Sequence, residues 1–187
     1  MLPRILEGNY RASTRTMLDV TVTREGDEVF GLTLLNDAVI TKDALARIID
    51  IETYVDNEYL TTFRGDGLIV STPTGSTGYS LAAGGPILYP SLEHAVLTPI
   101  CPHMLTNRPL VVGDEARIEV RLRAGRDVEV YAALDGQETF AFADGDHVVV
   151  TGSPRRLKLV KAPGRDYYEV LRTKLKWGDA GAPPRRG

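Results

Sequence analysis

The sequence has few of the residues that mark secreted, metal-binding or membrane proteins. A single cysteine, Cys101, stands among 187 residues, so no internal disulfide can form. The three histidines are far apart and show neither HExxH spacing nor cysteine neighbours. No apolar run is long enough to cross a membrane, and the start MLPRILEGNY lacks the apolar core of a signal peptide. We therefore expect a cytoplasmic protein with no membrane partner and no metal site of its own.

Charge of one sign is also lacking. The 22 Lys and Arg residues nearly balance the 25 Asp and Glu residues, giving a net charge of -3, and the basic residues are scattered. Because proteins that bind nucleic acid gather basic residues on one surface, this distribution argues against a nucleic-acid partner. What the chain does have is 43% hydrophobic residues, enough to bury a core in one domain or two small ones.

Alternating apolar and polar residues predict a β-rich fold. LDVTVT at 18–23 and VFGLTLL at 29–35 flank the turn residues EGDE and predict a hairpin. Further strand-like runs occur at 47–55, 59–63, 67–72, 95–100, 116–122, 128–134, 147–152 and 156–162. The turn signals DNE, RGDG, AGRD, DGQE and ADGD separate them at short, even spacing. This pattern predicts a mainly β protein, with an antiparallel, sandwich-like or barrel-like arrangement.

Two segments indicate helices. SLAAGG, at 80–85, predicts a short helix start. DYYEVLRTKLKWG, at 166–178, begins with the capping-box spacing of Asp166 and Glu169 and ends on a glycine. An apolar stripe within this second helix is predicted to comprise Tyr168, Leu171, Leu175 and Trp177.

A polar loop, TPTGSTGYS at 72–80, follows the strand-like run at 67–72. It matches neither the GxxxxGK[ST] nor the GxGxxG phosphate motif. Six Ser and Thr hydroxyls lie between Ser71 and Ser80, with the phenol of Tyr79 and two glycines that allow close backbone approach. Such an uncharged surface suits a ribose, a base edge or phosphate oxygens. The alternative is a turn followed by a helix cap.

Two further pairs of polar residues stand out. Asn36 and Asp37 interrupt the apolar run LLNDAVI, where a buried strand would need partners for both side chains. A carboxylate beside an amide can bind ribose hydroxyls and a base edge, although a turn at a strand end would also explain the pair. The second pair is Arg64 and Asp66, in FRGDG just before the polar loop. They could equally form an exposed ion pair in a surface turn, which would contribute little to stability.

Several motifs together resemble one family. NDAVI, YLTTFRGDGLIVSTPTGSTGYSLAAGGPIL, TPICPHMLTNRPLVV, DGQ and KLKW occur in the same order as in the C-terminal half of bacterial NAD kinases, from about residue 4 to residue 178. The resemblance implies transfer of the terminal phosphoryl of ATP, or of polyphosphate, to the 2′-hydroxyl of the adenosine ribose of NAD, giving NADP. It also implies Mg²⁺ bound with ATP, and a homo-oligomer, either a dimer or a tetramer.

The resemblance further implies a set of ligand contacts. Asn36 and Asp37 match residues that contact adenine and ribose, and Asp66 matches a residue that reaches the nicotinamide side, often from a neighbouring subunit. The adenine, ribose and pyrophosphate would be surrounded by Thr74, Thr77, Gly78, Tyr79, Ser80, Leu81 and Ala82. Further contacts are expected for Arg47, Arg64 and Gln137, and, on the adenine side, for the backbone near Cys101. Two positions depart from the family: Gly78 replaces a usual alanine, and Asp37 stands where many members have glutamate.

The family's proposed general base is the aspartate of a GGDG motif, and no GGDG occurs in this sequence. We therefore expect residues 1–16 to connect to a catalytic domain, 17–163 to form the β-rich NAD-binding domain, 164–178 the C-terminal helix and 179–187 a disordered tail. The chain alone is expected to form no NADP. Two other hypotheses are the β-rich domain of a diacylglycerol or sphingosine-type lipid kinase, and a non-catalytic nucleotide-binding or structural sandwich.

Overall fold

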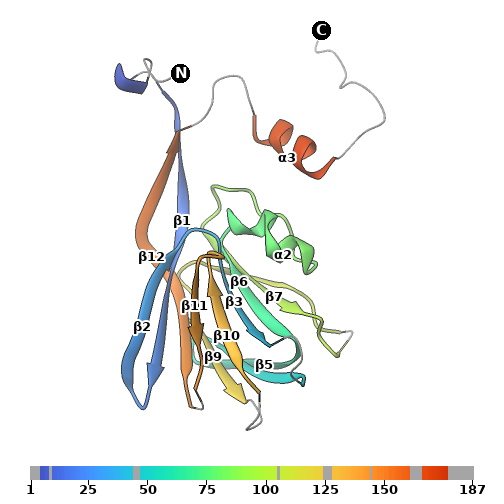
Figure 1. Cartoon of the computed structure of the whole chain (residues 1–187). Helices are drawn as coiled ribbons and strands as arrows, with labels where there is room; N and C mark the ends of the chain where they lie inside the picture. The colour runs from blue at the N-terminus through green and yellow to red at the C-terminus, as the bar shows by residue number, and fades with distance from the viewer. Residues whose placement is uncertain are drawn as a thin grey trace. The chain divides into compact units, whose positions relative to one another are not determined.

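The computed structural model describes residues 5–8, 10–43, 47–104, 106–123, 128–143, 145–160 and 166–176 (Figure 1). It contains two compact units: Thr14–Lys158 form the larger, and Met1–Ser13 with Leu159–Gly187 the smaller. The boundaries expected from the sequence at residues 16, 163 and 178 remain a prediction.

Two six-stranded antiparallel sheets build the larger unit. The first sheet has the order β2-β1-β12-β9-β4-β5, with β2 at Asp27–Leu34, β1 at Ala12–Arg24, β12 at His147–Val160, β9 at Ile118–Arg123, β4 at Ile49–Val55 and β5 at Glu58–Gly65. The second has the order β11-β10-β3-β6-β7-β8, with β11 at Glu138–Ala141, β10 at Val130–Leu134, β3 at Asp37–Lys42, β6 at Gly67–Ser71, β7 at His94–Ile100 and β8 at Leu110–Gly113.

Alternate residues of both sheets form one shared core. Leu18, Val20 and Val22 of β1 are buried in the same hydrophobic cluster as Leu68 and Val70 of β6. Because side chains alternate between the two faces of a strand, this spacing of two places every second residue between the sheets. The expectation of a mainly β, sandwich-like protein is confirmed.

Strand β6 is buried along its whole length, on both faces. Its Ile69 belongs to a second small cluster with Val39 and Ile100, against which Ala83 packs. Ala83 directly follows the short helix α2, Tyr79–Ala82. The segment after β6 thus folds back over the outer face of the second sheet, which explains why GLIVS reads as a continuous apolar run.

The sequence-based strands differ from the structure in two respects. The runs at 147–152 and 156–162 form one strand, β12, as far as Val160, because Gly152 donates to Asp114 O at 2.9 Å and the chain stays extended. A Cβ on Gly152 would meet that same oxygen at 2.2 Å, so the glycine marks a close approach and not a turn. Strands β3, β8 and β11 were not predicted, and the turn AGRD lies outside the described residues.

In the smaller unit, helix α3 spans Tyr167–Leu175. Asp166 caps it, because its Oδ1 accepts from Glu169 N at 2.7 Å, as the capping box predicted. Lys176, in a left-handed conformation with φ 53°, ends the helix before the predicted glycine. Of the predicted stripe, Leu171 is buried and Tyr168 is 58% exposed, while Trp177 lies outside the described residues.

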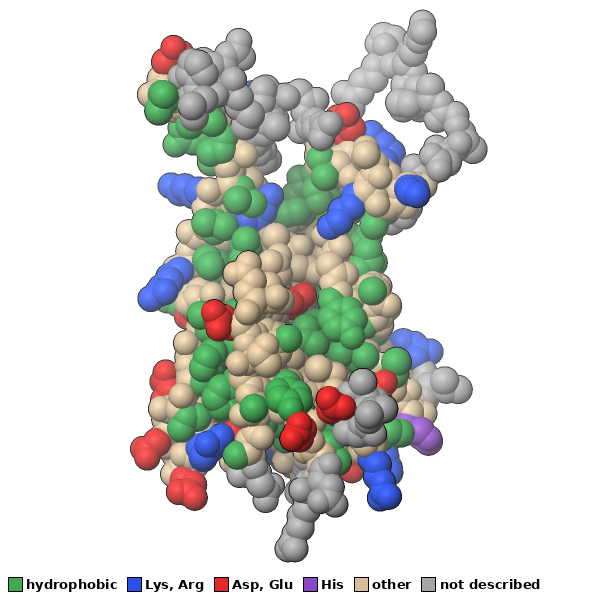
Figure 2. Space-filling model, in the orientation of Figure 1, with side chains coloured by type: hydrophobic (Ala, Val, Ile, Leu, Met, Phe, Trp, Pro, Cys, Tyr) green, Lys and Arg blue, Asp and Glu red, His purple; other side chains and the backbone are tan. Residues whose placement is uncertain are grey.

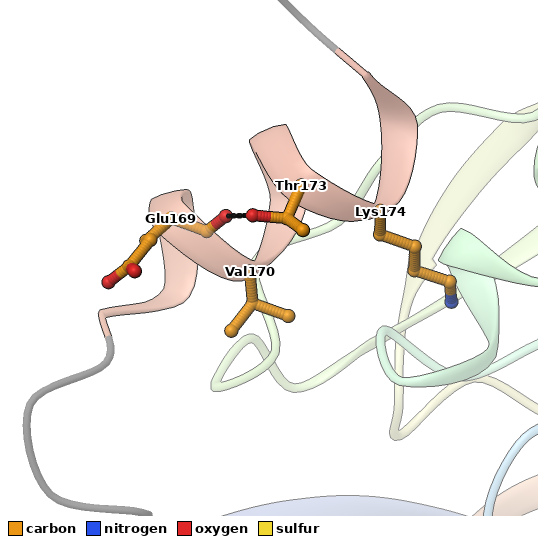
Figure 3. Close-up of a pocket in the computed structure, with 4 residues that line it drawn as sticks. All are labelled: Glu169, Val170, Thr173 and Lys174. Carbon is orange, nitrogen blue, oxygen red and sulfur yellow. Dashed lines mark hydrogen bonds between the residues drawn. The ribbon is translucent and has the colours of Figure 1, made fainter. Parts of the chain in front are cut away.

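Figure 3 shows a shallow pocket on this helix, lined by Glu169, Val170, Thr173 and Lys174. Thr173 Oγ1 donates to the backbone oxygen of Glu169 at 2.8 Å, one helical turn back. All four lining residues are exposed and come from helix α3.

Candidate functional site

Three chain segments meet at one end of β6. Asp37, which begins β3, pairs with Ser71, which ends β6, and the next residue of β3 pairs with Leu134, the last residue of β10. We call this the loop end and define it as residues 35–37, 71–82 and 135–137. Helix α2 contacts β6 and lies beside this end of the sheet (Figure 1).

Every backbone polar group of residues 35–37 is hydrogen-bonded. The carboxylate of Asp135 accepts all three N–H groups, from Leu35 at 2.8 Å, Asn36 at 2.6 Å and Asp37 at 3.1 Å. Thr72 Oγ1 donates to Leu35 O, Thr72 N donates to Asn36 O, and Asp135 N donates to Asp37 O. Because the backbone is fully satisfied by two neighbouring segments, the Asn36 and Asp37 side chains are not needed to complete it.

The Asp37 carboxylate is desolvated and accepts no hydrogen bond from the part of the chain that the structure describes. The residue is only 8% exposed. Burial raises the pKa of Asp37 to about 6, and the nearby charge of Asp135 adds to the shift. A desolvated carboxylate with no donor costs free energy in the ligand-free chain, and hydroxyl groups of a ligand would supply donors.

Within the polar loop, several hydroxyls serve the fold. Thr72 Oγ1 accepts from Thr74 N and Gly75 N, both at 3.1 Å, which starts the 3₁₀ turn η1 at Gly75–Thr77. Ser76 Oγ donates to Pro73 O at 2.8 Å and accepts from Leu88 N at 3.0 Å. For Thr72 and Ser76, the alternative of a turn with a cap is therefore correct.

The remaining groups of the loop end differ in exposure and in their hydrogen bonds. Thr74 Oγ1 is buried and has no hydrogen-bond partner among the described residues, and Tyr79 is 48% exposed. Gly78 and Ala82 are exposed, while Leu81 and Thr77 are half-buried. Ser80 is buried and shares a hydrogen bond of 2.9 Å with Thr98, so only its backbone remains for a ligand. Exposed Gln137 follows the turn that carries Asp135.

The other predicted residues lie at the opposite end of β6, where Gly67 pairs with Thr41 and Ile100. We call this the Asp66 end and define it as residues 40–42, 64–67 and 100–101. It also includes exposed Cys101, with φ 45°; exposed Arg47 lies two residues before Ile49, which pairs with Gly65. Since β6 has five residues, the two ends are about 15 Å apart.

Arg64 and Asp66 do not pair with each other, which corrects the ion pair considered as an alternative. Asp66 lies 3.3 Å from Lys42 Nζ, and Arg64 Nε lies 3.8 Å from Asp50. The two side chains of FRGDG point to different sheets because β5 belongs to the first sheet and β6 to the second.

Sequence reasoning missed the residues that organise the loop end. Asp135 lies in a DG turn after an alternating run, which is a signal for a tight hairpin. This signal gives no indication that the carboxylate accepts three hydrogen bonds from residues 35–37. Thr72 was counted only as one hydroxyl among six. Its position immediately after the buried strand, two residues before Thr74, was the available signal for a capping role.

Clusters of metal ligands and of basic side chains are two further marks of function. No group of three or more His, Cys, Asp or Glu side chains among them is arranged to hold a metal ion. On the face shown in Figure 2, the Lys and Arg side chains drawn stand singly or in small groups, interspersed with acidic ones. Among the residues that the structure describes, no helix has the length and apolar character to span a membrane.

Comparison with known proteins identifies the family. The family model described as the ATP-NAD kinase C-terminal domain matches residues 35–162, which include both ends of β6. The chain belongs to the ATP-NAD kinase family. It is 54% identical to an NAD kinase of Geotalea daltonii over 178 residues, which cover 95% of this chain and 62% of that protein. An NAD kinase of Geobacter metallireducens is 53% identical, with 95% and 62% covered.

Solved structures show the same fold. A yeast NADH kinase, crystallised in complex with NADH, superposes with a TM-score of 0.89 at 22% identity, over 98% of this chain and 56% of that chain. An NAD kinase from Archaeoglobus fulgidus in complex with ATP gives a TM-score of 0.75 at 28% identity, over 94% and 64%. The chain thus spans somewhat less than two thirds of the relatives it matches.

Proposed function

We propose that this chain is the NAD-binding part of an NAD kinase, which phosphorylates the 2′-hydroxyl of the adenosine ribose of NAD to give NADP. One observation carries the proposal: the backbone of residues 35–37 is fully hydrogen-bonded, while the Asp37 carboxylate beside it is buried with no donor among the described residues. That arrangement suits a ligand with vicinal hydroxyls, and the family membership names such a ligand.

The loop end would bind the adenosine half of NAD. The Asp37 carboxylate accepts hydrogen bonds from the ribose, and the Asn36 amide reads a base edge. The buried hydroxyl of Thr74 and the exposed ring of Tyr79 contact the ribose or the pyrophosphate. The backbone from Thr77 to Ala82 approaches the same groups, and Gln137 borders them. A neutral surface of this kind orients the acceptor hydroxyl, which is a large part of what phosphoryl transfer needs.

The Asp66 end would serve the nicotinamide half of NAD bound to a neighbouring copy, with Arg47 and Arg64 as further contacts. Cys101 lies at the same end, and the contact expected from its backbone is to the adenine side. The two ends are separated by the length of β6, so they would contact different parts of the dinucleotide. The chain would therefore act as a dimer or tetramer. The outer strands β5 and β8 offer sheet edges for such pairing.

The phosphoryl donor would be ATP or polyphosphate. Because the described residues contain no cluster of metal ligands, Mg²⁺ would arrive bound to the donor phosphates and neutralise their charge there. The general base would be supplied by a GGDG aspartate, and none occurs in these 187 residues. We therefore propose that the chain binds NAD in the cytoplasm but forms no NADP without a GGDG-bearing domain.

Calorimetry of the 187-residue chain with NAD, NADP and a diacylglycerol tests this proposal. We expect the dinucleotides to bind and the lipid not to bind, whereas a lipid kinase domain would show the reverse. Asp37→Ala should weaken NAD binding by at least about 1.5 kcal/mol, because a charged acceptor is lost. An unchanged dissociation constant in this variant would remove Asp37 from the site.

An activity assay tests the division of labour. NADP formation from NAD, ATP and Mg²⁺ is expected only after addition of a GGDG-bearing domain, in cis or in trans. The chain is also purified from a host strain depleted of its own NAD kinase, which controls for contamination. If the chain alone forms NADP at the same rate in both preparations, the proposal is wrong.

A further inference from the structure

Asp135 has an unusual backbone conformation. Its φ is 50° and that of Gly136 is 66°, both in the left-handed region, and Gln137 N donates to Leu134 O at 3.0 Å. This is the tight turn that joins β10 to β11, and Asn or Asp tolerates its first position. The turn alone therefore does not require a carboxylate at this position.

The role of the Asp135 carboxylate follows from the hydrogen bonds that it accepts. Its two oxygens receive three consecutive N–H groups, at 2.6 to 3.1 Å, from the segment that carries Asn36 and Asp37. An amide side chain could keep one oxygen there but would turn an NH₂ group toward at least one donor. Asp135 thus connects the β10–β11 turn to the start of β3 through its negative charge.

The chain contains a second turn of the same shape. Asp56, with φ 52°, and Asn57, with φ 66°, join β4 to β5. Asp56 N donates to Arg117 O at 2.9 Å, and its Oδ1 accepts from Arg117 N at 2.8 Å. The conformation and the type of contact match those of Asp135, but Asp56 receives one N–H group instead of three, and its partner is not a candidate site residue. Asp56 is therefore a matched control.

We propose that Asp135 is the positioning residue of the nucleotide site: it fixes residues 35–37 through their N–H groups and keeps a second negative charge beside the donor-free carboxylate of Asp37. The inference rests on the proposed function in that NAD is taken as the ligand. Asp135 acts through its neighbours and does not itself contact the dinucleotide.

Coupling between ligand binding and protonation follows from this arrangement. Asp135 is the charged group that acts on Asp37, while the segment on its other side presents uncharged Ser71 and Thr72. Burial and the Asp135 charge raise the pKa of Asp37 to about 6 in the ligand-free chain. Ribose hydroxyls that donate to the ionised carboxylate lower this pKa, so NAD binding should strengthen as pH rises through about 6 and level off above it.

The test compares Asp135→Asn with Asp56→Asn in the full chain. Both substitutions keep a side chain that tolerates the left-handed conformation, so their costs to the turn itself are similar. At pH 8, we expect Asp135→Asn to weaken NAD binding at least about tenfold and Asp56→Asn to change it less than about twofold. Loss of the neighbouring charge should also move the midpoint of the affinity-against-pH curve to lower pH in Asp135→Asn only. Equal effects of both variants on affinity and midpoint would overturn the proposal.

Measurements without ligand separate this inference from the proposed function. Carbon-detected NMR of the ligand-free chain follows the titration of the Asp37 carboxyl, and hydrogen exchange reports on the amides of residues 35–37. If NAD does not bind to the wild-type chain, the proposed function fails, but a lower Asp37 midpoint and faster amide exchange in Asp135→Asn would still support the positioning role. If Asp135→Asn does not fold, the wild-type titration decides: a midpoint near 4 would overturn the proposal.

Discussion

The two ends of β6 use the same kinds of residue in different surroundings. Each end has a closely packed glycine: a Cβ on Gly75 would meet Asn36 O at 2.3 Å, and one on Gly67 would meet Ile40 O at 2.3 Å. Each also has an aspartate, but Asp37 is buried beside another carboxylate, while Asp66 lies 3.3 Å from Lys42 Nζ. The backbone packing is thus similar at the two ends, but the surroundings of the carboxylates differ. Among the described residues, Asp37 has no hydrogen-bond donor, whereas Asp66 has the cation of Lys42.

This difference separates what the fold needs from what a ligand can use. At the loop end, backbone groups are satisfied by Thr72 and Asp135, and the open positions are the side chains of Asn36, Asp37 and Thr74. At the Asp66 end, Asp66 already has a charged partner within the chain. Substitutions at the two ends should therefore change stability and binding in different proportions.

The largest effect is expected from Gly75→Ala. The new Cβ would lie 2.3 Å from Asn36 O and 2.6 Å from Ser71 Oγ, so the loop must move away from β3. We expect a loss of more than about 3 kcal/mol in the free energy of unfolding, measured with urea, and loss of NAD binding.

Gly78→Ala is the matched control for the close contact, because its Cβ would meet only Gly75 O, at 3.1 Å. Its ψ of -127° lies outside the regions that alanine prefers, so we expect a loss of about 1 to 2 kcal/mol from the backbone, smaller than the loss in Gly75→Ala. Equal losses in the two variants would show that the loop does not depend on the close approach at Gly75.

Thr72→Val should have the next largest effect. The Thr72 hydroxyl donates to Leu35 O at 2.6 Å and accepts from Thr74 N and Gly75 N, so its removal takes the partner from one buried and two partly buried backbone groups. We expect a loss of about 2 to 3 kcal/mol in urea unfolding. Thr72→Ser keeps the hydroxyl and should recover most of it. If valine and serine are equally destabilising, the methyl group and not the hydroxyl supports the loop.

Asp37→Asn is expected to separate stability from binding. The pKa of Asp37 is raised in the folded chain from 3.8 to about 6, so the folded state binds its proton more tightly than the unfolded state. Wild-type stability contributed by this group is therefore present below about pH 4 and is lost as pH rises to about 6, a change of about 2 kcal/mol.

Urea unfolding between pH 4 and pH 8 measures this change. The asparagine variant should lack that decline and be the more stable protein at pH 8, while binding NAD more weakly. The Asp66→Asn variant serves as its control and should keep the decline. A wild-type stability that stays flat between pH 4 and pH 6 would contradict the assignment of a raised pKa to Asp37.

The sandwich was predictable because its signals are local. Alternation at 18–23 fixes which side chains of β1 face the core, and DNE marks the turn at Asp56 and Asn57. Where the structure depends on distant partners, the prediction from sequence was wrong. Gly152 and Pro154 read as a break between two strands, whereas the close approach of Asp114 O keeps β12 continuous.

For the candidate site, composition indicated the segment but not the direction of each side chain. Ser76 and Ser80 look equivalent to Thr74 in TPTGSTGYS, yet they point inward to Pro73 and Thr98. Their direction follows from the 3₁₀ turn, whose hydrogen bonds depend on Thr72 and Leu35, a pair 37 residues apart. The separation of the predicted residues by the length of β6 likewise required the register of the sheet.

The smallest effect on stability is expected from Asp66→Asn. The ion pair with Lys42 is half exposed on its acidic side, so its loss should cost less than about 1 kcal/mol in urea unfolding. Its effect on NAD binding should depend on association between copies, since the Asp66 end is proposed to contact NAD bound to a neighbour.

We therefore expect Asp66→Asn to weaken NAD binding only at protein concentrations at which light scattering shows a dimer or tetramer, whereas Asp37→Asn weakens it at every concentration. Because mass action makes the population of assembled sites depend on concentration, only a site built from two copies can give this contrast. If Asp66→Asn weakens binding equally in dilute, monomeric samples, a single copy must bring both ends of β6 to one NAD molecule, and the proposed division between the two ends would be wrong.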